Sequence, residues 1–143
     1  MEQIPLSATV DGVSAVCIRD QAFLLVERAR EPSKGRLAFP GGRREKGETP
    51  QEAAIRELHE ETGITATEVT YLTTVTFDYS TSEFPTPKPF RLAVFLARDP
   101  MGEAIAADDA AAVHWLRVEE MAAFDVTESV LDVVHELAGE FKI

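Results

Sequence analysis

Three glutamates, Glu57, Glu60 and Glu61, are spaced so that a helix would place their carboxylates side by side. At about 100° of rotation per residue, the i, i+3 and i, i+4 spacings keep them within an arc of about 100°. Clustered like charges destabilise a helix, by roughly a few tenths of a kcal/mol for each exposed pair. A divalent cation would reverse that effect, because hard cations bind carboxylate oxygens. The spacing therefore allows a cation site, and such a cation could bridge the acidic protein to a phosphate-bearing ligand.

The alternative is that these glutamates are only the solvated face of a helix in an acidic protein. The residues before the helix weaken this alternative. Gly41 and Gly42 mark a place where the backbone must approach another group closely. Glu48 has the reach to pair with Arg56 through two hydrogen bonds and so to brace the preceding loop against the helix. Such bracing would fix the geometry of the carboxylates.

The same residues match a known motif without a departure. Gly42 is followed after five residues by Glu48 and, after seven more, by the run Arg56-Glu57-Leu58-His59-Glu60-Glu61-Thr62-Gly63-Ile64. This spacing resembles the Nudix box, and the upstream Phe39-Pro40-Gly41-Gly42 is also similar to the family. The order of predicted elements around the box resembles the family over nearly the whole chain.

The resemblance implies an enzyme, a Nudix pyrophosphohydrolase. The carboxylates of Glu57, Glu60 and Glu61, with the backbone carbonyl of Gly42, match the ligands of one or more Mg²⁺ or Mn²⁺ ions. Glu57 also matches a catalytic residue that acts on the attacking water. The cation would clamp the diphosphate, neutralise the charge that develops in the transition state and lower the pKa of the water.

Further site residues rest on single positions. Glu48 and Arg56 match positions that orient the site. Asp109 lies six residues before Trp115, where several small members of the family place an acidic residue that joins the metal cluster or serves as the base. The alternative for Asp109 is that it only solubilises a turn before a strand. Arg28, at the end of a predicted strand, is a candidate for contact with a phosphate or a base.

Aromatic residues are candidates for stacking on a base, although aromatic residues near strands usually belong to the core. They are Phe39, which we assign to substrate binding, and also Phe77 and Tyr79. A predicted loop over residues 78–88 contains Phe84 and is long enough to form one wall of a pocket beside the diphosphate.

One helix is delimited most clearly. Thr49 is a predicted N-cap, Pro50 suits the first helical position, and Gly63 can supply a left-handed C-cap. Strands are predicted at 13–18, 22–27, 37–39, 69–77, 90–97 and 111–116, with a hairpin between the first two and a stop at Pro40-Gly41-Gly42. A helical turn at 118–124 and an amphipathic helix after Asp125 follow. This order predicts an α+β fold, an α/β/α sandwich in which a mixed sheet lies between helices, as one domain over residues 1–143.

Composition limits the partners. The chain has 25 acidic and 14 basic residues and a net charge of −11, which argues against non-specific binding to nucleic-acid polymers or anionic membranes. Cys17 is the only cysteine, so we expect a small buried side chain and a reducing compartment. Residues Met1 to Pro5 lack the features of a signal peptide, and no apolar run is long enough to span a bilayer. We therefore expect a soluble cytoplasmic protein. The sequence does not decide whether it forms a homodimer.

The expected activity is Mg²⁺-dependent cleavage of the phosphoanhydride bond in a nucleoside diphosphate that is linked to another group. ADP-ribose is the first expected substrate and a nucleoside triphosphate the second. Two alternatives are a non-catalytic module that senses a nucleotide and a hydrolase of a non-nucleotide pyrophosphate. Loss of a box carboxylate would mark the first alternative, and none is lost. The second stays open, because the box recognises the diphosphate, whereas the loops recognise the remaining part of the substrate.

Overall fold

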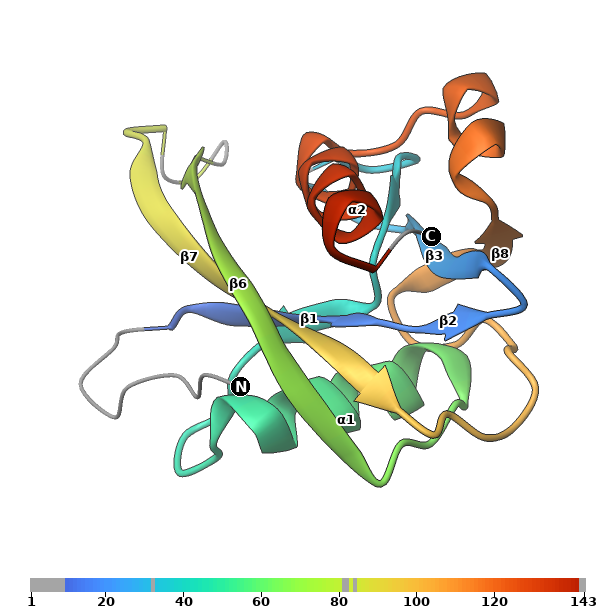
Figure 1. The fold of residues 1–143 in the computed structure, drawn as a ribbon. Helices are drawn as coiled ribbons and strands as arrows, with labels where there is room; N and C mark the ends of the chain where they lie inside the picture. The colour runs from blue at the N-terminus through green and yellow to red at the C-terminus, as the bar shows by residue number, and fades with distance from the viewer. Residues whose placement is uncertain (1–9, 32, 81–82, 84, 142–143) are drawn as a thin grey trace.

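The computed structural model describes residues 10–31, 33–80, 83 and 85–141. Two four-stranded sheets form the middle layer; helix α1 (Pro50–Thr62) packs on one side of them and helix α2 (Glu128–Phe141) on the other (Figure 1). The predicted fold class, mixed β structure between helices, is therefore confirmed. The difference is that the strands form two sheets. Within the described part of the chain, no helix is long and apolar enough to cross a membrane.

The first sheet carries the strands nearest to α1. Its strands are β1 (Gly12–Val16), β5 (Gly41–Arg43), β6 (Glu68–Tyr79) and β7 (Lys88–Arg98), in the order β5-β1-β7-β6. β1 and β7 are parallel and the other neighbours are antiparallel, so the sheet is mixed. β6 ends and β7 begins at the upper left of Figure 1.

The second sheet is centred on β3 (Ala22–Arg28). It pairs antiparallel with β2 (Ile18–Arg19), β4 (Leu37–Ala38) and β8 (Ala110–Leu116). The predicted hairpin is confirmed only for Ile18 and Arg19, because the residues before them belong to β1 in the other sheet. Asp20 and Gln21 form its turn with φ values of 52° and 68°, as tight hairpin turns require.

Side chains alternate between the two faces of each strand, so successive residues face α1 and α2 in turn. In β1, Val13 and Ala15 pack in clusters with α1, whereas Val16 packs in the cluster of α2. Cys17 is buried beside Leu58 of α1, and burial raises the pKa of its thiol to about 11. The prediction of a small buried side chain at Cys17 is confirmed.

One strand and one pair of boundaries differ from the prediction. The strand that begins at Leu37 does end before Pro40, as predicted, but Gly41–Arg43 forms a further strand, β5, which pairs with β1 and was not predicted. This is possible because Gly41 lies so close to Val13 that a side chain would overlap the Val13 carbonyl oxygen. β6 and β7 are also longer than expected: β6 extends to Tyr79 and β7 begins at Lys88, so both strands run into the predicted loop at 78–88.

The helical turn predicted at 118–124 is confirmed as the 3-10 helix η1 (Val118–Ala123). Phe84 and the residues Met1 to Pro5 lie outside the described part of the chain.

Candidate active site

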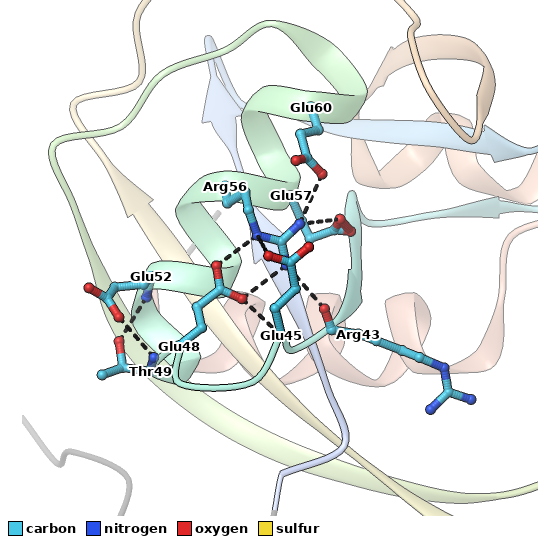
Figure 2. A network of polar contacts seen from close by, with 8 residues as sticks. All are labelled: Arg43, Glu45, Glu48, Thr49, Glu52, Arg56, Glu57 and Glu60. Carbon is cyan, nitrogen blue, oxygen red and sulfur yellow. Dashed lines mark hydrogen bonds and ion pairs between the residues drawn. The ribbon is translucent and has the colours of Figure 1, made fainter.

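Helix α1 begins and ends where the sequence predicts. The Thr49 hydroxyl oxygen accepts a hydrogen bond from the Glu52 N–H at 3.1 Å, and a Glu52 carboxylate oxygen accepts one from the Thr49 N–H at 2.9 Å (Figure 2). This reciprocal capping satisfies two backbone donors, and Pro50 lacks the third. At the other end Gly63 has φ 78° and donates its N–H to the His59 carbonyl at 2.8 Å. The caps fix both ends of the helix that carries the three glutamates.

The three glutamates of α1 differ in exposure. Glu61 is only 7% exposed, the Glu57 side chain is mostly buried, and the Glu60 side chain is 41% exposed. On the helix, Glu61 lies within the same arc as the buried Ala54 and Leu58, because these positions are related by about 20° and 60° of rotation. The alternative of a solvated face therefore fails at Glu61, the most deeply buried of the three carboxylates.

Glu61 is held under β5. Its carboxylate accepts a hydrogen bond from the Gly41 N–H at 3.0 Å, and its backbone carbonyl accepts one from the Ala107 N–H at 3.0 Å. Burial raises the pKa of Glu61 to about 7 against the lowering effect of the Gly41 hydrogen bond, and the charge of Glu57 raises it further. The carboxyl thus holds its proton more strongly than an exposed glutamate does.

Glu57 lies against the backbone of Gly42. A Cβ atom at position 42 would overlap the Glu57 carboxylate, so only glycine allows this approach. Burial raises the pKa of Glu57 to about 7; the charge of Arg56 opposes the rise, and Glu60 adds to it. Two neighbouring carboxyls with raised pKa values indicate a site whose negative charge lacks a sufficient partner in the protein.

Arg56 is the cation at the centre of the network in Figure 2. Its Nε donates to Glu48 Oε2 at 2.7 Å and its Nη2 to Glu48 Oε1 at 3.0 Å, which confirms the predicted bidentate pair. Hydrogen bonding to Arg56 holds the pKa of Glu48 below its usual value. Nη2 also donates to the Arg43 carbonyl at 3.1 Å, while Nη1 donates to Glu60 at 2.9 Å and to Glu57 at 3.2 Å. Arg56 therefore fastens the loop before α1 to the helix, as predicted.

The structure brings two further candidates to the carboxylates. The charges of Arg28 and Asp109 both act on the pKa of Glu61, Arg28 lowering it and Asp109 raising it. A register shift between β3 and β8 falls at Arg28, and such bulges redirect side chains. The Asp109 carbonyl accepts from the Ala29 N–H at 3.1 Å, and the Asp109 carboxylate forms an ion pair with Arg30 at 3.0 Å. The sequence alone did not indicate Arg30, because its partner Asp109 is far along the chain.

The predicted aromatic candidates lie in different surroundings. Phe39 is buried in the core, with its ring centroid 6.4 Å from that of Phe23. This is the placement usual for aromatic residues near strands, and it leaves little ring surface for a ligand. Phe77 is 40% exposed. Nothing is described for the side chain of Tyr79.

The donor atoms at this site suit a hard divalent cation. Glu57, Glu60, Glu61 and the Gly42 carbonyl offer only oxygen, and the carboxylates carry excess negative charge. In the part of the chain that the structure describes, no three His, Cys, Asp or Glu side chains already converge as a metal-binding group. Arg56 engages Glu60 and one oxygen of Glu57 instead. A cation would therefore have to take over the interactions of Arg56 Nη1.

Solved structures share this architecture. A MutT NUDIX hydrolase from Burkholderia pseudomallei superposes with a TM-score of 0.76 at 24% identity, covering 90% of this chain and 98% of that one. A bifunctional NMN adenylyltransferase/ADP ribose pyrophosphatase from Francisella tularensis, complexed with AMP and a Mn ion, has a TM-score of 0.68 at 28% identity. The match covers 96% of this chain and 43% of the Francisella chain.

Proteins with similar sequences are also named as pyrophosphatases or diphosphatases. An ADP-ribose pyrophosphatase of Methanocaldococcus jannaschii is 45% identical over 58 residues, which are 41% of this chain and 32% of the relative. An 8-oxo-dGTP diphosphatase of Proteus vulgaris is 46% identical over 69 residues, or 48% of this chain and 62% of the relative. The matched segments thus span less than two thirds of these relatives. The NUDIX domain family matches residues 8–137, most of the sequence. The chain belongs to the NUDIX family.

Proposed function

We propose that this protein is a Mg²⁺-dependent pyrophosphohydrolase that cleaves the phosphoanhydride bond of a nucleoside diphosphate linked to a second group. The observation that carries the proposal is the packing of Glu57 and Glu61 against the Gly41 and Gly42 backbone, with a raised pKa at both carboxyls. Burying neighbouring like charges is costly unless an opposite charge compensates them. A divalent cation would supply that charge, and the diphosphate would bind to the cation.

The residues that would hold Mg²⁺ or Mn²⁺ are Glu57, Glu60, Glu61 and the Gly42 carbonyl. When bound, the cation neutralises charge on the diphosphate and makes the attacking water more acidic. Glu60 is the exposed member, and it would have to give up its hydrogen bond from Arg56 to hold the cation. The two bonds from Arg56 to Glu48 use other nitrogens and could stay in place.

We assign the proton of the attacking water to one of two candidate carboxylates. Glu57 is the first candidate, because it lies in the carboxylate cluster against the Gly42 backbone. Asp109 is the second candidate, since its charge reaches Glu61 from the loop before β8. Arg28, which also acts on Glu61, is the candidate to contact a substrate phosphate.

Among substrates we favour ADP-ribose, followed by nucleoside triphosphates. Support comes from the relatives named ADP-ribose pyrophosphatase and 8-oxo-dGTP diphosphatase and from the Francisella neighbour with AMP and a Mn ion. The products would be a nucleoside monophosphate and the remaining phosphate-bearing part.

A substrate panel tests this proposal. Purified protein with Mg²⁺ is assayed against ADP-ribose, nucleoside triphosphates, dinucleoside polyphosphates, nucleotide sugars and an isoprenoid pyrophosphate, and the substrates are ranked by kcat/KM. We expect ADP-ribose to rank first, and Glu60→Gln to lower its turnover by orders of magnitude with the fold unchanged by circular dichroism. Cleavage of the isoprenoid compound alone would refute the nucleotide assignment, and a complete lack of turnover with intact metal binding would favour a nucleotide sensor.

A further inference from the structure

A cavity opens between η1 and α2. Its volume is about 430 Å³, which is within the range of roughly 300–1,000 Å³ found for ligand pockets. Apolar side chains of both elements line it, among them Val118, Met121, Leu131 and Val134. In Figure 1 the two elements stand near each other at the upper right, η1 in orange and α2 in red. We call this cavity the η1–α2 groove.

The floor of the η1–α2 groove is part of the core. Met121 is 3% exposed and belongs to the buried cluster of α2, and Leu131 packs against that cluster. Backbone hydrogen bonds fix the segment that joins η1 to α2. The Leu37 N–H donates to the Asp125 carbonyl at 2.9 Å, and the Thr127 N–H donates to the Leu37 carbonyl at 3.0 Å. The groove is therefore preformed, and the flexible methionine at its floor can adapt to an apolar side chain.

An aromatic ring stands exposed at the edge of the η1–α2 groove. Phe124 is one of the lining residues and is 43% exposed, and its ring centroid lies 5.7 Å from that of His114. Large apolar side chains that remain in water beside an apolar cavity mark interaction surfaces, and aromatic residues are enriched in them. The groove thus has the form of a receptor for an apolar side chain.

Acidic side chains border the groove on both elements. On α2, the exposed Asp132 lies three residues before the lining residue His135, about 60° around the helix from it. In η1, the exposed Glu119 shares an edge with the lining residue Ala122, because positions i and i+3 eclipse in a 3-10 helix. One carboxylate therefore lies on each side of the apolar floor.

Few cations balance these acids. Arg36 pairs with Asp125 and with Glu128, each at 3.0 Å, beside the start of α2. The sequence from Val118 to Leu137 contains six acidic residues and no Lys or Arg. A second copy of this chain, with its net charge of −11, would be repelled by such a surface, and so would an anionic membrane. The charge of the rim is complementary to a cationic partner.

We propose that the η1–α2 groove docks a cationic amphipathic segment of a partner protein. An apolar side chain of the segment enters the cavity and contacts Met121 and Phe124, and its Lys or Arg side chains face Glu119 and Asp132. In recognition of this kind the buried anchor gives the affinity, and charges at the rim orient the partner. The inference goes beyond the proposed function, and the docking needs no hydrolysis.

Fluorescence anisotropy with a labelled synthetic helix of leucine and lysine in amphipathic order tests the docking. We expect this helix to bind the wild-type protein and the same helix with glutamate in place of lysine not to bind. Ala122→Trp should weaken binding by more than roughly fivefold, because the indole fills the cavity and excludes an anchor worth more than about 1 kcal/mol. Ala123→Trp is the matched control, since Ala123 is exposed and lies outside the lining; the affinity should change by less than about twofold.

Charge reversal separates docking from general attraction to an acidic protein. Asp132→Lys should weaken binding of the leucine–lysine helix roughly three- to fivefold, because it replaces an attraction at the rim by a repulsion. Glu136→Lys makes the same charge change one turn later on α2. Glu136, however, lines a different cavity with Leu72 and Thr73 of β6. Its affinity should stay within about twofold of wild type. Circular dichroism verifies that all variants keep the fold.

Four results would overturn the docking site. The first is failure of the leucine–lysine helix to bind wild type. The second is equal affinity for the lysine and glutamate helices, which would leave only an apolar surface. The third is an equal effect within either pair of variants, Ala122→Trp with Ala123→Trp or Asp132→Lys with Glu136→Lys. The fourth is a wild-type dimer in light scattering that Ala122→Trp converts to a monomer, since the groove would then bind a second copy.

Discussion

Glu61→Gln should stabilise the metal-free protein and remove its response to metal. The pKa of Glu61 is about 7 in the folded protein against an ordinary value of 4.5, because the carboxylate is buried. That difference corresponds to roughly 3 kcal/mol of unfolding free energy. A raised pKa favours the folded state while the group is protonated, so this stability is fully present below about pH 4.5 and is lost as the pH rises to about 7. Glutamine mimics the protonated form and can still accept the Gly41 hydrogen bond.

Urea unfolding at pH 5 and pH 8 in excess chelator measures this effect. Wild type should lose stability between these two pH values, by roughly 3 kcal/mol from Glu61 and an additional amount from Glu57. At pH 8, Glu61→Gln should be more stable than wild type by a similar roughly 3 kcal/mol. Added Mg²⁺ should stabilise wild type and leave the variant nearly unchanged.

The matched control is Glu119→Gln, which removes one negative charge from an exposed residue of η1. It should change the free energy of unfolding by less than about 0.5 kcal/mol at either pH. The reasoning is refuted if Glu61→Gln is less stable than wild type at pH 8 in chelator, since the buried charge would then not oppose folding.

Two further variants test neighbouring residues. Asp109→Asn should lower kcat much more than it raises KM if this carboxylate handles the attacking water. Asp108→Asn should behave as wild type, because asparagine tolerates the φ of 56° at this residue. Equal, near-normal kinetics for both variants would leave Asp109 as a solvated turn residue. Arg56→Lys should lower the free energy of unfolding by about 1–3 kcal/mol, because lysine cannot reproduce the fork that satisfies both oxygens of Glu48. A loss below about 0.5 kcal/mol in urea unfolding would contradict the bracing role of Arg56.

Local sequence signals predicted helix α1 well. Thr49, Pro50 and Gly63 act within one or two turns of themselves, so their spacing was enough to place both ends of α1. The pair of Glu48 and Arg56 was also predictable, because a short loop and the start of the helix separate the two residues.

Features that depend on distant strands were not predictable. The Gly41 segment looked like a stop, and only its pairing with β1 makes it a strand. The unequal burial of the glutamates has the same origin: the spacing gives their angles on α1, but the position of Gly41 over Glu61 decides which carboxylate is covered. Likewise, the contact of Arg43 with Phe90 joins strands that are far apart in the chain.

The most direct test of the central claim is the rate at which AMP is released from ADP-ribose in Mg²⁺ and in excess chelator. We expect steady release of AMP and ribose 5-phosphate with Mg²⁺, no release in chelator, and recovery when Mg²⁺ or Mn²⁺ is restored. Glu57→Gln should stay inactive at every Mg²⁺ concentration, because the variant lacks both a proposed metal ligand and the first candidate base. Undiminished release of AMP by the wild-type protein in excess chelator would contradict the proposed dependence on a divalent cation.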